Sequence, residues 1–232
     1  MNPNRDLIKT FTGPLAGVVC TIVYLLCYAE VLPLGELIVA GDPKTALLEP
    51  WRLLTHPFIH LSATHLAVNV TALIIAFSWL GRKTGALKSI AVCLGGAVCG
   101  AACFLAVCGL SGHSDSFVGG ASGGIYSMLT CAALLNNGLT IRVWDKNVRL
   151  NGKIMVTVLA AVAVSGIFGA NPGGAIAHAG GIIAGASFAL LAPKEHKPQR
   201  NPLADKAQQS GYLSLTPGEK SRLGNHLNNP EL

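Results

Sequence analysis

One serine and one histidine lie among small residues within long runs that lack charge. Ser122 sits in the run Gly119–Gly124, which reads GGASGG, and His178 follows a stretch of glycine and alanine. A serine hydroxyl is a weak nucleophile until a base removes its proton, and a neutral histidine is the commonest such base near neutral pH. The two residues are therefore a candidate dyad for acyl transfer.

A second polar group precedes this pair in the chain and supplies hydrogen-bond donors. His60, His65 and Asn69 lie near the start of one apolar run. Acyl transfer needs donors around the negative oxygen of its tetrahedral intermediate. The Asn69 amide, the His65 ring and the Ser122 backbone N–H are the candidate donors, and His60 fits a bracing role.

The neighbours of the candidate dyad suit a close approach of two helices. Tyr126 lies one helical turn after Ser122 and can stack beneath an imidazole. Gly120, Gly123 and Gly181 lack side chains, and small residues let membrane helices touch backbone to backbone. The apolar runs around Ser122 and His178 contain no carboxylate, so the sequence predicts a dyad rather than a triad.

The elements that must position these residues are membrane helices. Of the 232 residues, 51% are hydrophobic and only 12% are charged, which excludes an ordinary soluble domain and a disordered chain. Mean hydropathy is +0.50. Asp, Glu, Lys and Arg are absent from residues 11–29, 53–81, 89–114, 116–141 and 154–193.

Each of these runs is long enough to cross a bilayer, which takes about 20 apolar residues. The last run contains Asn171-Pro172-Gly173-Gly174, which favours a turn between two helices. The sequence thus predicts an all-α polytopic protein with six spans, near residues 12–32, 60–80, 87–109, 119–137, 153–170 and 175–192.

The basic residues predict the orientation of this bundle. All of the 17 Lys and Arg residues except Lys44 and Arg52 fall on one side of the predicted spans. Because Lys and Arg are retained in cytoplasmic loops, both termini should be cytoplasmic. We therefore expect a cytoplasmic N-terminus at 1–11, a membrane domain at 12–192 and a disordered cytoplasmic tail at 193–232.

The combined motifs resemble the rhomboid family of intramembrane serine proteases. The matching elements are Trp51-Arg52, the H-x4-H-x3-N pattern of His60, His65 and Asn69, the G-x-S-G element of Gly120–Gly123, Tyr126, and the pattern G-x3-A-H-x2-G-x3-G over Gly173–Gly185. The resemblance covers roughly residues 12–192. Its rhombosortase branch is similar in size.

The resemblance implies a six-helix bundle in which Ser122 is the nucleophile, His178 the base, and His65 and Asn69 form the oxyanion pocket. It also implies that single-pass transmembrane proteins are cleaved near the outer membrane face. A rhomboid-like pseudoenzyme that binds membrane helices, or a small transporter, is the alternative.

No cofactor, metal or nucleic acid is expected. His56 and His60 are separated by Pro57 and lack a third ligand with suitable spacing, and the net charge of +6 is explained by topology and by attraction to anionic lipid. The partners expected are the lipid bilayer and the substrate helices. The compact core suggests a bacterial inner membrane.

Overall fold

The computed structural model describes residues 3–112, 115–136, 138–143, 145–168, 171–193 and 202–228. The chain divides into two compact units, Met1–Leu191 and Ala192–Leu232. The first unit contains the residues singled out above, so the candidate site belongs to it alone.

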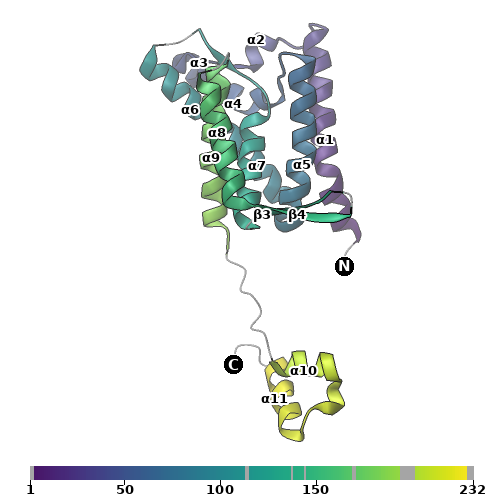
Figure 1. Cartoon of the computed structure of the whole chain (residues 1–232). Helices are drawn as coiled ribbons and strands as arrows, with labels where there is room; N and C mark the ends of the chain where they lie inside the picture. The colour runs from purple at the N-terminus through teal and green to yellow at the C-terminus, as the bar shows by residue number, and fades with distance from the viewer. Residues whose placement is uncertain are drawn as a thin grey trace. The chain divides into compact units, whose positions relative to one another are not determined.

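The first unit is a bundle of long helices, as the sequence predicts (Figure 1). Four of them, α1, α5, α6 and α9, are long and apolar enough to cross a membrane, and α7 and α8 are shorter apolar helices. The helices are α1 (Pro3–Tyr28), α5 (Ala63–Thr84), α6 (Ala86–Ser111), α7 (Ser122–Leu135), α8 (Gly152–Ile167) and α9 (Pro172–Leu191). The all-α bundle is therefore confirmed, and the chain is an integral membrane protein.

Helices α6, α7 and α9 form the closely packed centre of the bundle, while α1 packs on α5 and α8 packs on α9. Buried residues such as Phe77, Leu80 and Met128 fill the core beside α7. Large apolar side chains remain exposed on the outer faces, for example Leu15 on α1 and Val158 on α8. These faces suit hydrocarbon rather than water.

The start of α9 corrects one detail of the sequence prediction. The sequence predicts two helices separated by a turn at Asn171–Gly174, and the two helices α8 and α9 are confirmed, but α9 already begins at Pro172, within the predicted turn. The Asn171 Oδ1 accepts the Gly174 N–H at 2.9 Å, and Pro172 is the first helical residue. Asparagine before a helix and proline in its first position are both favoured, because neither sacrifices an intrahelical hydrogen bond.

The segment between α1 and α5, which we call the first loop, is ordered by short elements. These are α2 (Leu34–Leu37), β1 (Val39–Ala40), α3 (Pro43–Leu48), α4 (Arg52–Thr55) and the 3-10 helix η1 (His56–Phe58). Strand β1 pairs antiparallel with β2 (Phe117–Val118), with Val39 opposite Val118. The first loop is therefore tied to the segment that leads into α7.

Arg52 holds the first loop together from inside. Its guanidinium is buried and donates to the Ile38 carbonyl at 2.8 Å, to the Gly35 carbonyl, and to the Glu49 carboxylate. The buried charge is thus paired and hydrogen-bonded, as a buried cation must be.

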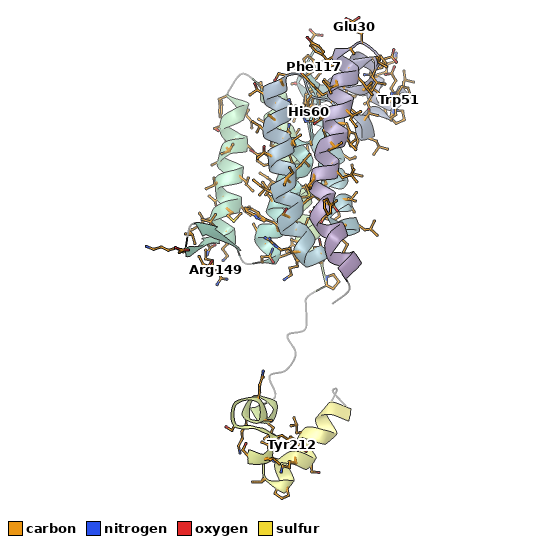
Figure 2. All side chains as sticks on the ribbon, turned by 90° about the vertical axis from the view of Figure 1, so that its right-hand side faces the viewer. Glu30, Trp51, His60, Phe117, Arg149 and Tyr212 are labelled. Carbon is orange, nitrogen blue, oxygen red and sulfur yellow. The ribbon has the colours of Figure 1, made fainter. Side chains whose placement is uncertain are left out.

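A β-hairpin joins α7 to α8, which the sequence did not predict. Strands β3 (Gly138–Val143) and β4 (Lys146–Asn151) pair antiparallel, with Thr140 opposite Arg149. All six residues of β4 are exposed, so no buried face of this strand stands out in the sequence. Figure 2 shows Arg149 at one end of the bundle and His60 and Phe117 at the other.

The second unit contains the tail at 193–232 for which the sequence predicts disorder. Over residues 202–228 it forms α10 (Pro202–Ser210), the 3-10 helix η2 (Tyr212–Ser214) and α11 (Pro217–Asn228). Leu215 and Leu223 are buried, and Lys206 forms an ion pair with Glu219 at 2.8 Å. A few well-spaced leucines suffice to bring two short helices together, and composition alone does not reveal that spacing.

Candidate active site

The structure brings Ser122 and His178 into hydrogen-bond contact. The His178 Nε2 lies 2.9 Å from the Ser122 Oγ, across the interface of α7 and α9. Both side chains are half-buried, so each remains accessible from the site. When Nε2 accepts the Ser122 hydroxyl proton, the other ring nitrogen, Nδ1, carries the imidazole proton.

Tyr126 fixes the plane of the imidazole. Its ring lies parallel to that of His178, with ring centroids 4.3 Å apart and an interplanar angle of 7°. Tyr126 is four residues after Ser122, so one face of α7 carries both the hydroxyl and the stacking ring. The stacked ring restricts rotation of the imidazole away from the serine.

Glycines allow α7 and α9 to approach closely enough for this contact. A Cβ placed on Gly181 would lie 2.2 Å from the Gly123 carbonyl oxygen, and one on Gly185 would lie 2.2 Å from the Ser127 carbonyl oxygen. Real atoms cannot approach so closely, so side chains at these positions would force the helices apart. Serine and histidine are short, and their contact depends on this backbone packing.

Gly120 shapes the backbone just before the serine. Its φ is +113°, a conformation that favours glycine, and a Cβ there would lie 2.8 Å from the His65 Cε1 and 3.4 Å from the Asn69 Nδ2. Both side chains therefore lie against the backbone that leads into Ser122. Ser122 is the first residue of α7, and N–H groups in the first turn of a helix have no intrahelical acceptor.

Two buried nitrogen atoms near this backbone have no hydrogen-bond partner within the part of the chain that the structure describes. They are the Asn69 Nδ2 and the His60 Nε2. Asn69 is 4% exposed and His60 is 1% exposed. Because an unsatisfied buried donor costs about 1–3 kcal/mol, an orphaned amide beside a serine indicates a place for an acceptor. The His60 ring packs edge-on against His65, with centroids 5.1 Å apart.

His56 is a residue whose contribution sequence reasoning missed. Its backbone carbonyl accepts the Gly120 N–H at 2.8 Å, and its buried ring bonds the Arg52 carbonyl through Nδ1 at 3.1 Å. His56 therefore links the first loop to the serine loop. This role cannot be predicted from the sequence, because every residue type has the same backbone carbonyl.

A hollow of about 370 Å³ lies beside the site. Leu61, His65, Phe117, Gly119 and Asn171 are among the residues that line it. Phe117 lies at the same end of the bundle as His60 (Figure 2). His65 and Gly119 are the lining residues nearest to the serine segment, and the hollow offers room for water beside the His65 ring.

These features define a class: a helical membrane protein whose packed core holds a serine–histidine pair beside unpaired hydrogen-bond donors. The Rhomboid domain family matches residues 48–195 of the chain. The chain therefore belongs to the rhomboid family, a family of intramembrane serine proteases that also includes inactive members. Comparison with curated proteins gives no match.

Proposed function

We propose that this chain is an intramembrane serine endopeptidase that cleaves single-pass transmembrane proteins near the outer membrane face. Ser122 is the nucleophile and His178 is the general base. The observation that carries the proposal is the 2.9 Å hydrogen bond between the Ser122 Oγ and the His178 Nε2. Family membership supports the reaction class.

In the first half of the reaction, the Ser122 Oγ attacks the scissile carbonyl carbon and its proton passes to the His178 Nε2. The tetrahedral intermediate then collapses, the C–N bond breaks, and the imidazolium returns the proton to the leaving amine. An acyl-enzyme ester remains on Ser122. The nucleophilic attack and both proton transfers require only the two residues that the hydrogen bond joins.

In the second half, water attacks the ester carbonyl while the His178 Nε2 takes its proton. The C–O bond to Ser122 breaks, and the imidazolium returns the proton to the Ser122 oxygen. The hollow that His65 lines offers room for water on this side of the site. The unpartnered Asn69 amide, the His65 ring and the Ser122 backbone N–H are the donors for the negative oxygen of both intermediates.

Labelling by a fluorophosphonate tests the assignment of the nucleophile. We expect the wild-type chain in detergent micelles to be labelled and Ser122→Ala to remain unlabelled. Ser187→Ala is the matched control, because Ser187 lies exposed on α9 and its hydroxyl bonds the Ile183 carbonyl of its own helix. Cleavage of a reporter transmembrane helix that persists in Ser122→Ala would contradict the proposal, and an unlabelled wild type would indicate an inactive rhomboid protein.

A further inference from the structure

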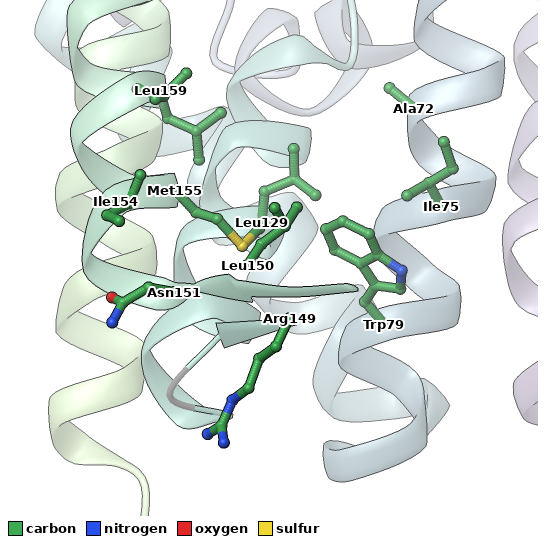
Figure 3. A pocket seen from close by; sticks show the side chains of 11 residues that line it. Ala72, Ile75, Trp79, Leu129, Arg149, Leu150, Asn151, Ile154, Met155 and Leu159 are labelled. Carbon is green, nitrogen blue, oxygen red and sulfur yellow. The ribbon is translucent and has the colours of Figure 1, made fainter. Parts of the chain in front are cut away.

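A second cavity lies between α5 and α8, above the β3–β4 hairpin (Figure 3). Its volume is about 510 Å³, and its lining is almost entirely apolar. Figure 3 shows side chains converging on it from opposite sides, with Ile75 and Trp79 on α5 facing Leu150, Met155 and Leu159. The cavity has the size of a site for a small organic ligand.

This cavity is separate from the serine site. Trp79 follows His65 by 14 residues on α5. At about 1.5 Å per residue, the two lie about 21 Å apart along the helix axis. The cavity therefore lies toward the opposite end of the bundle from Ser122, and the proposed peptidase reaction does not use it.

The open side of the cavity faces the surroundings of the bundle. Helices α5 and α8 make little direct contact with one another. On α8, Ile154 is 64% exposed and Val158 is 55% exposed, and both line the cavity. In a membrane protein such exposed apolar side chains contact lipid tails, so the cavity is continuous with hydrocarbon.

Basic side chains stand at the floor of the cavity, where β4 meets α8. Arg149 lines the cavity, and Lys146 and Lys153 lie close to it in the sequence and are exposed. The backbone of Arg149 pairs with Thr140, but its guanidinium has no hydrogen-bond or ion-pair partner among the described residues. Figure 3 shows its side chain directed away from the apolar lining, at the edge of the hairpin. An apolar cavity with a guanidinium at one edge matches a molecule that has a long apolar tail and an anionic headgroup.

We propose that this cavity binds an anionic phospholipid, with one acyl chain between α5 and α8 and the headgroup phosphate on Arg149. The positive charge of the hairpin favours this occupant over a membrane-spanning peptide. Such peptides usually carry their own Lys and Arg at the cytoplasmic boundary, and these would be repelled by Arg149, Lys146 and Lys153.

Quenching of Trp79 by brominated lipid tests the proposal in the full chain. The chain is placed in phosphatidylcholine nanodiscs that contain a small fraction of either phosphatidylglycerol or phosphatidylcholine with brominated chains. Trp51→Phe and Trp144→Phe in the same chain leave Trp79 as the emitter. We expect phosphatidylglycerol to be preferred over phosphatidylcholine about fivefold, which corresponds to about 1 kcal/mol for one basic residue near an anionic headgroup.

Two variants test the headgroup contact and the acyl-chain site separately. Arg149→Gln should remove the preference for phosphatidylglycerol, whereas the matched control Arg82→Gln, an exposed position in the last turn of α5, should keep it. Ala72→Phe places a ring in the cavity and should lower quenching by both lipids. Circular dichroism shows whether each variant remains helical.

Three results would overturn the proposal. One is equal quenching by both lipids in the parent chain, which would indicate general contact with hydrocarbon. Another is quenching by brominated phosphatidylglycerol that Ala72→Phe does not lower, which would place the lipid on the surface rather than in the cavity. The third is quenching relieved by a transmembrane peptide but not by unbrominated phosphatidylglycerol, which would assign the cavity to a helix.

Discussion

At the scale of single residues, Asn69 shows how a site can depend on an unsatisfied group. Its side-chain amide is buried against the backbone of Gly120, and its Nδ2 has no acceptor among the described residues. A residue kept only for stability would be expected to pair this donor. An amide held ready for an oxygen that forms during the reaction has a reason to remain unpaired.

Replacing Asn69 should therefore separate activity from stability. We expect Asn69→Ala to lower kcat for a reporter helix on the order of 100-fold to 1000-fold, the usual effect of losing one oxyanion donor. The thermal unfolding midpoint should be unchanged or slightly raised, because an unpaired buried donor is removed. Parallel losses in kcat and in the unfolding midpoint would instead indicate a purely structural residue.

Much of the site could be predicted from residue types and spacing, because few polar side chains enter the charge-free runs. Ser122, His178, His65 and Asn69 stand out for this reason. The contribution of His56 could not be predicted, because it acts through its carbonyl oxygen. The same holds for the positive φ of Gly120, which depends on how the first loop and α5 meet around it.

At the scale of elements, the packing of α9 on α7 determines whether the serine and histidine meet. Gly181→Ala should increase the separation of these helices, because its Cβ would lie 2.2 Å from the Gly123 carbonyl oxygen. We expect loss of fluorophosphonate labelling and a destabilisation of about 1–3 kcal/mol, as for other overpacked cores.

The matched control for this substitution is Gly81→Ala on α5. The nearest atom to a Cβ there is the Ser89 Oγ at 3.8 Å, an ordinary van der Waals distance. Labelling and unfolding should remain close to wild type in this variant. Full labelling of Gly181→Ala in the same assay would show that the dyad tolerates a wider helix separation than the structure indicates.

The first loop should lose stability in acid through His56. Burial of the ring lowers the pKa of His56 from 6.5 to about 4. Between pH 6.5 and 4 the unfolded chain binds a proton that the folded chain does not, so His56 destabilises the fold progressively as pH falls through this window. Above pH 6.5 this penalty is absent.

Thermal unfolding of the micelle-bound chain at pH 7.5 and at pH 5 measures this effect. The drop in midpoint between the two values should be smaller in His56→Gln, which cannot titrate, than in wild type. The comparison uses the change with pH within each variant, so any constant effect of the substitution cancels. Equal drops would show that His56 does not contribute to the acid sensitivity.

The long helices were predictable and the short elements were not, for one physical reason. A span is required by the hydrocarbon that it crosses, and its composition shows this directly. Strand β1 exists because Val39 meets Val118 from a distant part of the chain, which no local pattern encodes. The same limit explains why Asn171-Pro172 was interpreted as a turn, since both turns and helix starts favour these residues.

At the scale of the whole molecule, the distribution of charge predicts which way the bundle lies in the membrane. The end that carries Arg149 also carries Arg82 and Lys83 at the end of α5. Ser122 and His178 lie toward the opposite end, at the starts of their helices. We propose that both termini are cytoplasmic and that the candidate site opens on the outer side.

Reporter fusions check this orientation. Green fluorescent protein fused after Leu232 should fluoresce, because it folds in the cytoplasm, and alkaline phosphatase fused after Gly112 should be active, because it requires the outer side. Exchanging the two reporters provides the control, and both signals should then vanish. An active phosphatase at Leu232 would reverse the proposed orientation and place the site on the cytoplasmic side.

The ties between the first loop and the serine segment limit how the protein can open. The Gly41 N–H bonds the Ser116 carbonyl at 2.7 Å, the Gly120 N–H bonds the His56 carbonyl at 2.8 Å, and β1 pairs with β2. If the first loop moved away from the bundle, it would pull on β2 and on the segment that leads from β2 to Ser122. Opening the site in this way would displace Ser122 from His178 for as long as the loop stayed open. Substrate entry and nucleophilic attack would therefore have to occur one after the other.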